Sequence, residues 1–410
     1  MRKFCCLYFI LFFGIPTQLL PNENKKFTLD EIIRIGLQNN PWIAARLSEV
    51  RAKQEAYKAS KRLFNPELEL HAGKAEAYDG LETRNTQGMA LSQPVENPFK
   101  RHFRIQMFEN DWRASENQAD FSKLELTFEI KTVFFKILLL KNLQNLAGKN
   151  LDSISEIQRL IEKRAELGEV KQLEAIKLQV ETLKARNELN KVQTELRLAK
   201  EDLNRLLNNV LPQDFSVAGR LEYRSFAEEE ESLVTKTLLF YPLIKMKEHE
   251  IQTAQSNLSR IKWQRFPDFK LSGFSHKELD GTNTGFGLSL DIPIWNIQSR
   301  EIAQAESLLS KNKSELQALL LKVSTEVKSK LGKLRLSEQT LELYHSGLLN
   351  QAEESLKISE ASYREGEISL VDFLDSQRTY YSIMTDYQNS LYTWNVDKAA
   401  LEKAVGEDIQ

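Results

Sequence analysis

Polar and acidic side chains follow a glycine near the carboxyl terminus at spacings that could bind cations. Ser369 lies three residues after Gly366, and Asp372 lies three residues after Ser369. This spacing is typical of a helix start in which the hydroxyl caps free backbone amides and the carboxylate lies at the positive end of the helix dipole. Asp375 would share a helix face with Asp372. In a three-fold assembly the pair would become a ring of carboxylates able to gate or select cations, whereas in a single chain it would be an ordinary solvated cap.

An earlier glycine, Gly168, is followed by a related but different set of charges. Glu174 corresponds to Asp372 and Lys177 corresponds to Asp375 when the two segments are aligned, and no serine cap follows Gly168. A lysine beside an acidic ring would weaken the charge of that ring. The cation preference of such a ring therefore stays open.

The residue types that usually carry catalysis or bind metals are scattered. No histidine has a second histidine at ligand spacing, so we expect no metal site and no cofactor. No nucleophile elbow, phosphate-binding loop or dinucleotide fingerprint occurs, so we expect no enzyme. The formal net charge is −2 and no strongly basic stretch is present, which argues against a nucleic-acid partner. The five histidines are His71, His102, His249, His276 and His345.

The amino terminus has the pattern of a secretory signal. Arg2 and Lys3 precede an apolar run at residues 4–15, which is too short to span a bilayer. We assign residues 1–21 to a signal peptide without fixing the cleavage site. Both cysteines, Cys5 and Cys6, lie in the apolar run, so the mature chain would contain no disulfide or thiol site.

The chain is a tandem duplication. Its prolines recur about 200 residues apart, and an internal repeat of this kind has to be recognised before any other assignment is made. We expect a first repeat at residues 27–210, a linker at 211–227 and a second repeat at 228–406. The matching pairs are Pro41 with Pro242, Pro66 with Pro267, and Pro94 with Pro293.

Each repeat predicts a long helical hairpin that turns at a glycine. No proline occurs between Pro98 and Pro212 or after Pro293, which favours helices far longer than the usual ~11 to 12 residues. The turns are expected near Gly168 and Gly366, with a second-copy helix as long and continuous as the first. After Gly168 the apolar spacing alternates three and four, which is a coiled-coil seam. Its members are Ala175, Leu178, Thr182, Ala185, Leu189, Val192, Leu196, Ala199, Leu203 and Leu206.

Each repeat also predicts one β-hairpin, at about residues 66–95 and 267–294. Large apolar residues alternate there with small or polar ones, which is typical of a hairpin with one apolar and one polar face. Four strands cannot close a sheet in a membrane, but three chains would supply twelve. The alternative is a small soluble four-stranded sheet beside the helices. Leu68, Leu70, Leu288 and Leu290 would form the lipid-facing side, opposite Glu67, Glu69, Ser289 and Asp291.

At these residues the chain resembles the TolC-type family of bacterial outer-membrane efflux proteins. The similarity covers nearly the whole mature sequence, and the order of its pieces, duplicated at the right spacing, is more specific than any one piece. The pieces are FTLDE at 27–31, LQNNP at 37–41, LSQP at 91–94 followed by Lys100 and Arg101, LSLDIPI at 288–294 and YREGEISLVD at 363–372.

The resemblance implies a mainly α protein with a small β part. Three chains would form a 12-stranded β-barrel in the outer membrane, continued by a 12-helix α-barrel in the periplasm. Such a homotrimer would be a passive exit duct for an inner-membrane pump and a periplasmic adaptor, or for a type I secretion system.

The resemblance also implies roles for the residues around the two glycine turns. The closed periplasmic aperture of the family is lined by a tyrosine three residues before the second glycine and by two aspartates after it. The candidate constriction is therefore Tyr363, Asp372 and Asp375, with Glu174 from the first copy. The candidate adaptor contact is the helical-tip turn, formed by Gly168, Arg364, Gly366 and Ser369.

A secreted periplasmic coiled-coil protein, such as an adaptor, is the alternative function. An adaptor would be expected to carry one helical hairpin within glycine-rich β domains, whereas this chain has two equivalent hairpins and little β sequence. The segment at residues 91–101 resembles the metal-efflux branch of the family, which leaves the exported substrate open.

Overall fold

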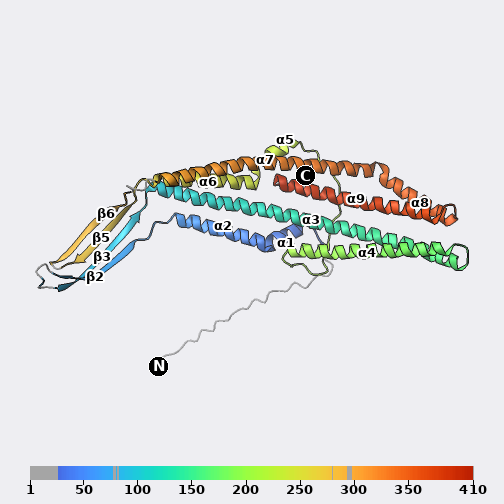
Figure 1. Ribbon diagram of the computed structural model, residues 1–410, viewed down its shortest axis with the longest axis horizontal. Helices are drawn as coiled ribbons and strands as arrows, with labels where there is room; N and C mark the ends of the chain where they lie inside the picture. Colours follow the sequence, from blue (N-terminus) through green and yellow to red (C-terminus); the bar gives the residue numbers. More distant parts are fainter. Residues whose placement is uncertain (1–25, 77–79, 81–82, 279, 293–297, 410) are drawn as a thin grey trace, which may run out of the picture.

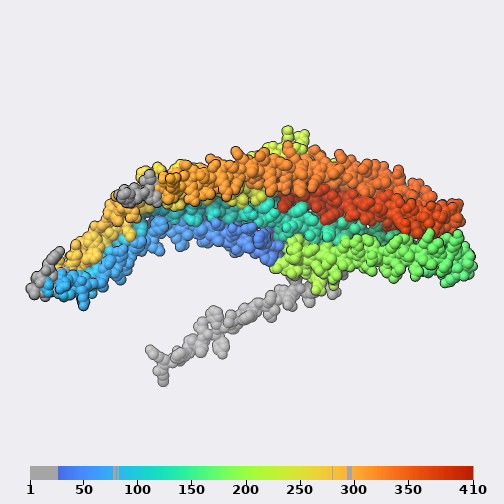
Figure 2. Space-filling model, viewed as in Figure 1, coloured from blue at the N-terminus to red at the C-terminus, as the bar shows by residue number. Residues whose placement is uncertain are grey.

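The chain forms a long, curved rod with a β-sheet at one end and two helical tips at the other (Figures 1 and 2). The computed structural model describes residues 26–76, 80, 83–278, 280–292 and 298–409. The expected mainly helical fold with a small sheet is confirmed. The signal-peptide prediction for residues 1–21 lies outside the described residues, as do residues 293 and 294 of the second predicted hairpin.

Each half begins with two short helices separated at a proline. In the first half these are α1 (Leu29–Asn39) and α2 (Pro41–Ser60), and in the second half α5 (Glu230–Phe240) and α6 (Pro242–Trp263). Proline suits the first helical position because the amide that it lacks has no partner there. The break therefore falls at the same place in both repeats.

Helix α3 (Pro98–Glu166) connects the two ends of the rod and contacts α1, α2, α4, α6 and α9 (Figure 1). It turns back into α4 (Gln172–Leu206). The predicted heptad seam is confirmed on α4, since all its members except Leu189 and Leu196 are buried and those two are half-buried. Close packing of that seam against α3 makes the first hairpin.

The second hairpin differs from the prediction because its outward helix is not continuous. It consists of α7 (Ser299–Leu343), a π-helical turn at Tyr344–Leu348 and α8 (Leu349–Glu365), and it returns as α9 (Leu370–Val405). Gly347 in the turn has a φ of 131°, which a residue with a side chain rarely adopts. The prediction of an unbroken helix was therefore wrong, and the interruption bends the rod where α7 meets α8 (Figure 1).

The segment between the repeats packs against the helices instead of hanging free. Strand β4 (Ser216–Val217) pairs in parallel with β1 (Lys26–Phe27). Phe215 and Val217 are buried in the main core cluster, and the Lys141 ammonium donates to the Val217 carbonyl at 3.2 Å. This segment therefore ties the start of the first repeat to the middle of the rod.

The sheet contains four antiparallel strands in the order β2-β3-β5-β6. Their bounds are Glu67–Glu76, Thr83–Val95, Phe269–Lys277 and Thr282–Leu290. The two β-hairpins, one from each repeat, pair with each other through β3 and β5. In this pairing Leu91 lies opposite Gly273. Strands β2 and β6 are the two edges of the sheet within one chain.

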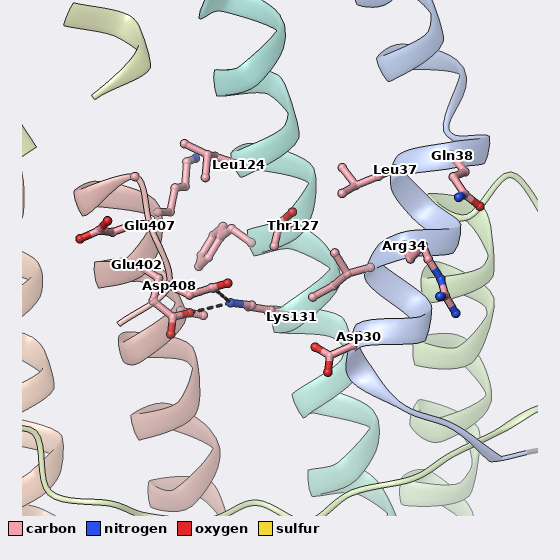
Figure 3. A pocket seen from close by; sticks show the side chains of 15 residues that line it. Asp30, Arg34, Leu37, Gln38, Leu124, Thr127, Lys131, Glu402, Glu407 and Asp408 are labelled. Carbon is pink, nitrogen blue, oxygen red and sulfur yellow. Dashed lines mark hydrogen bonds and ion pairs between the residues drawn. The ribbon is translucent and has the colours of Figure 1, made fainter. Parts of the chain in front are cut away.

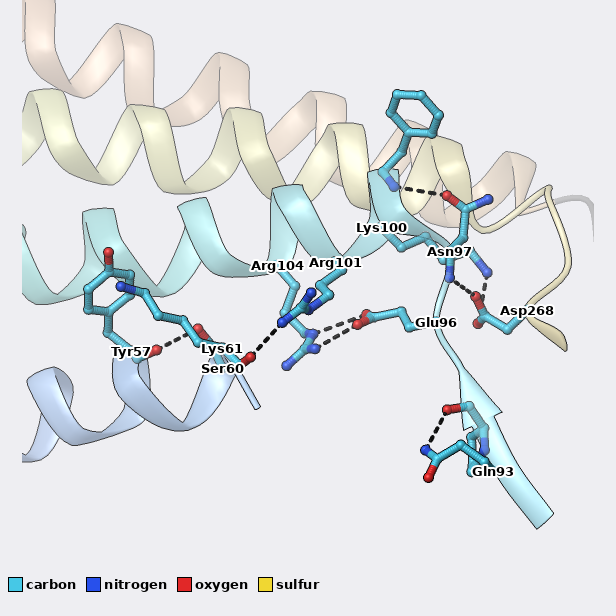
Figure 4. A network of polar contacts seen from close by, with 12 residues as sticks. Tyr57, Ser60, Lys61, Gln93, Glu96, Asn97, Lys100, Arg101, Arg104 and Asp268 are labelled. Carbon is cyan, nitrogen blue, oxygen red and sulfur yellow. Dashed lines mark hydrogen bonds and ion pairs between the residues drawn. The ribbon is translucent and has the colours of Figure 1, made fainter. Parts of the chain in front are cut away.

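Ionic and capping contacts fix the sheet to the helices at the start of α3 (Figure 4). Arg104 donates two hydrogen bonds to the Glu96 carboxylate, at 3.0 and 2.6 Å, and both side chains are largely buried. Asp268 accepts from the Asn97 amide at 2.8 Å and from the Lys100 ammonium at 3.0 Å. Because bidentate arginine pairs are directional, this junction sets the angle between the two parts.

None of the described helices has the length and hydrophobicity needed to cross a membrane.

Candidate functional site

One face of the sheet carries exposed apolar side chains across all four strands. Directly opposite residues in an antiparallel sheet point to the same side, and Leu68 pairs with Leu91 while Leu271 pairs with Leu288. A contiguous exposed apolar face of this kind marks an interaction surface with protein or lipid. Its exposed members are Leu68, Leu70, Met89, Leu91, Leu271, Phe286, Leu288 and Leu290.

The opposite face of the sheet is mostly polar or carries small residues, with Phe274 as its large apolar member. Glu67 forms an ion pair with Lys270 across the intervening strand, and Glu69 and Ser289 also lie on this face. Asp291 follows the end of β6 and lies outside the strand. The two faces therefore divide along the period-two pattern of the sequence.

Two histidines meet on this polar face, which corrects the expectation that all five histidines lie far apart. His71 and His276 both lie opposite Gly88, one on each neighbouring strand, and their ring centres are 6.0 Å apart. Spacing along the chain did not indicate this pair because the contact depends on how the two duplicated hairpins align side by side.

The helical tips are two turns with the same backbone geometry. Gly168 and Gly366 have φ values of +76° and +83°, the left-handed region that glycine occupies without strain. In each turn the glycine amide bonds the carbonyl three residues back, and the next amide bonds the carbonyl five residues back, as Glu367 does to Ser362 at 2.8 Å. This pair of bonds is the Schellman motif, which closes a helix and reverses the chain.

The start of α9 is a capping box built from two of the predicted residues. The Ser369 hydroxyl accepts from the Asp372 amide at 3.3 Å and donates to the Asp372 carboxylate at 2.7 Å. That carboxylate also accepts from the Ser369 amide. The predicted cap between Ser369 and Asp372 is therefore present at the start of α9.

Asp375 is exposed one turn after Asp372, so its charge faces solvent in the single chain. In the first copy, α4 begins at Gln172. The preceding Lys171 makes no side-chain cap bond within the described residues, and Glu174 lies in the first turn of α4. The two tips therefore have the same backbone conformation but differ in the charge of their side chains.

Tyr363 lies apart from the two aspartates, in the apolar seam between the two hairpins. Its ring stacks on Phe373, with ring centres 5.2 Å apart, and is 9% exposed. Its hydroxyl is buried and has no hydrogen-bond partner among the residues that the structure describes. Burial, together with the negative charge of Glu174, raises the pKa of Tyr363 to about 12. The seam also contains Ile157, Leu178 and Leu370.

Ion pairs between the two hairpins were missed by the sequence analysis. The Arg378 guanidinium on α9 donates to the Glu181 carboxylate on α4 at 2.6 Å. Arg364 pairs with Glu360 on its own helix at 2.7 Å and reaches Glu156 on α3 at 3.6 Å. Glu181 and Arg378 lie almost one repeat length apart in the sequence, so they occupy nearly equivalent positions in the two hairpins. Their opposite charges at these equivalent positions could have predicted the ion pair.

The charge of Glu181 is stabilised by this arrangement. Partial burial alone would raise its pKa, but hydrogen bonds from Lys184 and Arg378 outweigh burial and hold the pKa below its usual range. A lowered carboxylate pKa adds stability above the unfolded pKa, and this stability is lost as the pH falls through the folded pKa. The contact between the hairpins is therefore intact at neutral pH.

A groove of about 620 Å³ lies between α1, α3 and the end of α9 (Figure 3). The Lys131 ammonium donates to Glu402 at 2.8 Å and to Asp408 at 2.6 Å. Burial alone would lower the pKa of Lys131, but these two hydrogen bonds raise it above its usual value. The positive charge of Lys131 is thus paired with the carboxylates of Glu402 and Asp408. This contact attaches the carboxyl-terminal end of the chain to α3.

The profile of the outer membrane efflux protein family matches residues 32–209 and 233–407. The cobalt-zinc-cadmium resistance protein CzcC of Cupriavidus metallidurans is 20% identical over 362 residues, covering 88% of this chain and 85% of that protein. Outer membrane protein TolC of Vibrio cholerae is 23% identical over 444 residues, covering 99% of this chain and 96% of that protein.

Solved structures show the same fold. CusC superposes with a TM-score of 0.76 at 17% identity, covering 92% of both chains. The CmeC outer membrane channel of Campylobacter jejuni superposes with a TM-score of 0.79 at 16% identity, covering 92% of this chain and 85% of that one.

Replacing Tyr363 tests its place in the seam. Tyr363→Phe removes an unpaired buried hydroxyl, so thermal stability in detergent should stay the same or rise slightly. Phe373→Ala should destabilise the protein by about 3 to 5 kcal/mol because it leaves a cavity under the tyrosine ring. A large loss of stability in Tyr363→Phe would mean that the hydroxyl has a partner and would contradict this geometry.

Proposed function

Because this chain belongs to the outer membrane efflux protein family, we propose that three copies assemble into one passive channel. The channel is the outer-membrane exit duct of a tripartite export system. The sheets of the three chains form a 12-stranded barrel in the membrane, and the helices form an α-barrel below it in the periplasm. A periplasmic adaptor and an inner-membrane pump complete the path, and the energy for export comes from the pump.

The apolar face of the sheet is the observation that carries this proposal. Leu68, Leu70, Leu288 and Leu290 are each about half or more exposed in the single chain. A soluble protein would cover such a face, whereas lipid stabilises it. Within the described part of one chain, β2 and β6 have one neighbouring strand each. Lipid offers no hydrogen bonds to the free sides of these edges, so β2 of one copy pairs with β6 of the next.

The helices supply a second reason for assembly. Helix α4 exposes apolar side chains on the surface away from its buried seam, including Leu173, Ile176, Val180 and Leu183. A helix with an apolar second surface is expected to have a second helical neighbour. In the proposed trimer this surface meets a helix of the adjacent chain.

The tips form the gate of the proposed channel. Asp375 lies on the exposed side of α9, where three copies would surround the pore axis, and Glu174 lies in the first turn of α4, at the tip of the other hairpin. Asp372 contributes charge but also caps α9, and Tyr363 supports the gate from the seam behind it. The adaptor contacts the turns at Gly168, Arg364, Gly366 and Ser369.

A substitution in the sheet tests the orientation toward lipid. Leu288→Arg places a charge on the apolar face and should impair membrane assembly by about 2 to 4 kcal/mol if the residue lies near the midplane. In the matched variant Ser289→Arg, the new side chain points to the lumen of the proposed barrel, so this variant should assemble normally. Assembly is measured as the amount of heat-stable oligomer in outer-membrane fractions. Equal assembly of the two variants would contradict the assigned faces.

The ion pair between the hairpins should hold the tips closed. Glu181→Gln removes the charge that Arg378 binds, a loss of about 1 kcal/mol per chain, and should raise conductance in planar bilayers at neutral pH. Glu353→Gln is the control because Glu353 pairs with Lys357 within one helix, at 2.7 Å. Wild-type conductance should rise only as acid protonates Glu181. An equal change of conductance in both variants would contradict a role of the Glu181–Arg378 ion pair in closing the tips.

The exposed aspartate tests the charge of the constriction. Asp375→Asn keeps the size and leaves the Ser369–Asp372 cap intact, but it removes one carboxylate per chain from a narrow ring. Block of the channel by multivalent cations should weaken, because charges in a constriction concentrate counterions more than charges on an open helix face. Glu354→Gln on the exposed face of α8 is the control. Unchanged block in Asp375→Asn would return this residue to an ordinary helix surface.

A further inference from the structure

Two imidazoles lie close together on the polar face of the sheet. His71 on β2 and His276 on β5 are the direct neighbours of Gly88 on β3, so the three residues form one row across the strands. The ring centres are 6.0 Å apart and the ring planes are tilted by 44°. His71 is exposed and His276 is half-buried, so solvent reaches the pair.

Glycine at position 88 permits this approach. A Cβ atom built at Gly88 would overlap the Nδ1 atom of His276, because the imidazole ring lies directly over the glycine. A side chain there would displace His276 and separate the two rings. The neighbouring row repeats the pattern, since the ring of Phe274 lies over Gly285.

Acidic groups surround the two imidazoles. The Glu69 carboxylate lies 3.6 Å from Nε2 of His71, within ion-pair range but too far for a direct hydrogen bond. A hollow of about 570 Å³ beside the pair is lined by both histidines and also by Lys277, Glu278 and Asp280. With neutral imidazoles the acids outnumber the single lysine, so the local field favours a cation.

We propose that His71 and His276 form a binding site for a divalent transition-metal ion such as Zn²⁺, Ni²⁺ or Cu²⁺. Imidazole nitrogen suits these ions, and a metal ion about 2.1 Å from one nitrogen of each ring would leave the ring centres about 5 to 6 Å apart. That spacing agrees with the 6.0 Å observed. In this site Glu69 is the positioning residue, because its negative charge 3.6 Å from Nε2 of His71 favours a proton on that nitrogen and leaves Nδ1 for the metal.

The site binds the ion weakly enough to release it. The described residues contain no group of three or more His, Cys, Asp or Glu side chains arranged to hold a metal ion, so water completes the coordination of the two imidazoles. The proposed channel places this face toward the lumen, and in that respect the inference rests on the proposed function. Each chain then contributes one exchangeable metal site to the wall of the duct.

Zinc titration of the full-length protein in detergent tests the site. Isothermal calorimetry with zinc chloride should give about one ion per chain, and His71→Asn and His276→Asn should each weaken binding at least about tenfold. Glu69→Gln should weaken it about tenfold, as loss of an orienting carboxylate does. His102→Asn is the control, because His102 is exposed on α3 outside the sheet. Unaltered binding in the two variants of the pair, or no zinc binding by the wild type, would overturn the proposal.

Copper provides a readout that does not depend on affinity. The electron paramagnetic resonance spectrum of one Cu²⁺ per chain should show coupling to two imidazole nitrogens in the wild type and to one in His71→Asn. His71 is exposed, so this variant should keep its sheet, and circular dichroism checks this. A spectrum unchanged by His71→Asn would overturn the site. Conductance measured in the same preparation without metal tests the channel separately, so failure of one proposal is distinguishable from failure of the other.

Discussion

Hydrogen bonding at the edges of the sheet is the constraint on which the proposed assembly depends. The sheet presents leucines, a methionine and a phenylalanine on one face. Its edge strands, β2 and β6, each pair with one strand within the chain. An apolar face is stable in lipid, but lipid offers no partner for free backbone amides and carbonyls. We therefore propose that a chain with four strands pairs its edges with other copies of itself, in a three-fold arrangement that pools the strands.

Helix α3 links the sheet at one end of the rod to the helical tip at the other end. Helix α3 leaves the sheet at a junction fixed by the Arg104–Glu96 and Lys100–Asp268 pairs and ends at the tip beside Gly168. One continuous element thus relates the position of the sheet to the position of the tip. At the tip, the Tyr363–Phe373 stack and the Glu181–Arg378 pair join the two hairpins. Separating the hairpins requires these contacts to break, which is why we assign the gate to this end.

Local features could be predicted from the sequence because they depend on neighbouring residues. The heptad seam of α4 and the Ser369 cap each follow from spacings within one helix. The break at Gly347 was missed, because a single glycine in a long apolar pattern is compatible with a continuous helix. The β1–β4 pair, the meeting of His71 with His276 and the Glu181–Arg378 contact join residues far apart in the chain. Such contacts depend on register and packing, which the periodicity of one sequence does not fix.

The mass of the assembled protein in detergent tests the central claim most directly. Native mass spectrometry of the full-length protein, extracted from outer membranes and freed of detergent in the gas phase, should give three times the mass of the mature chain. Such a mass would agree with edge strands that pair between copies. A stable monomer that retains its β-sheet would show that four strands satisfy their edges without other copies, and it would contradict both the barrel and the channel.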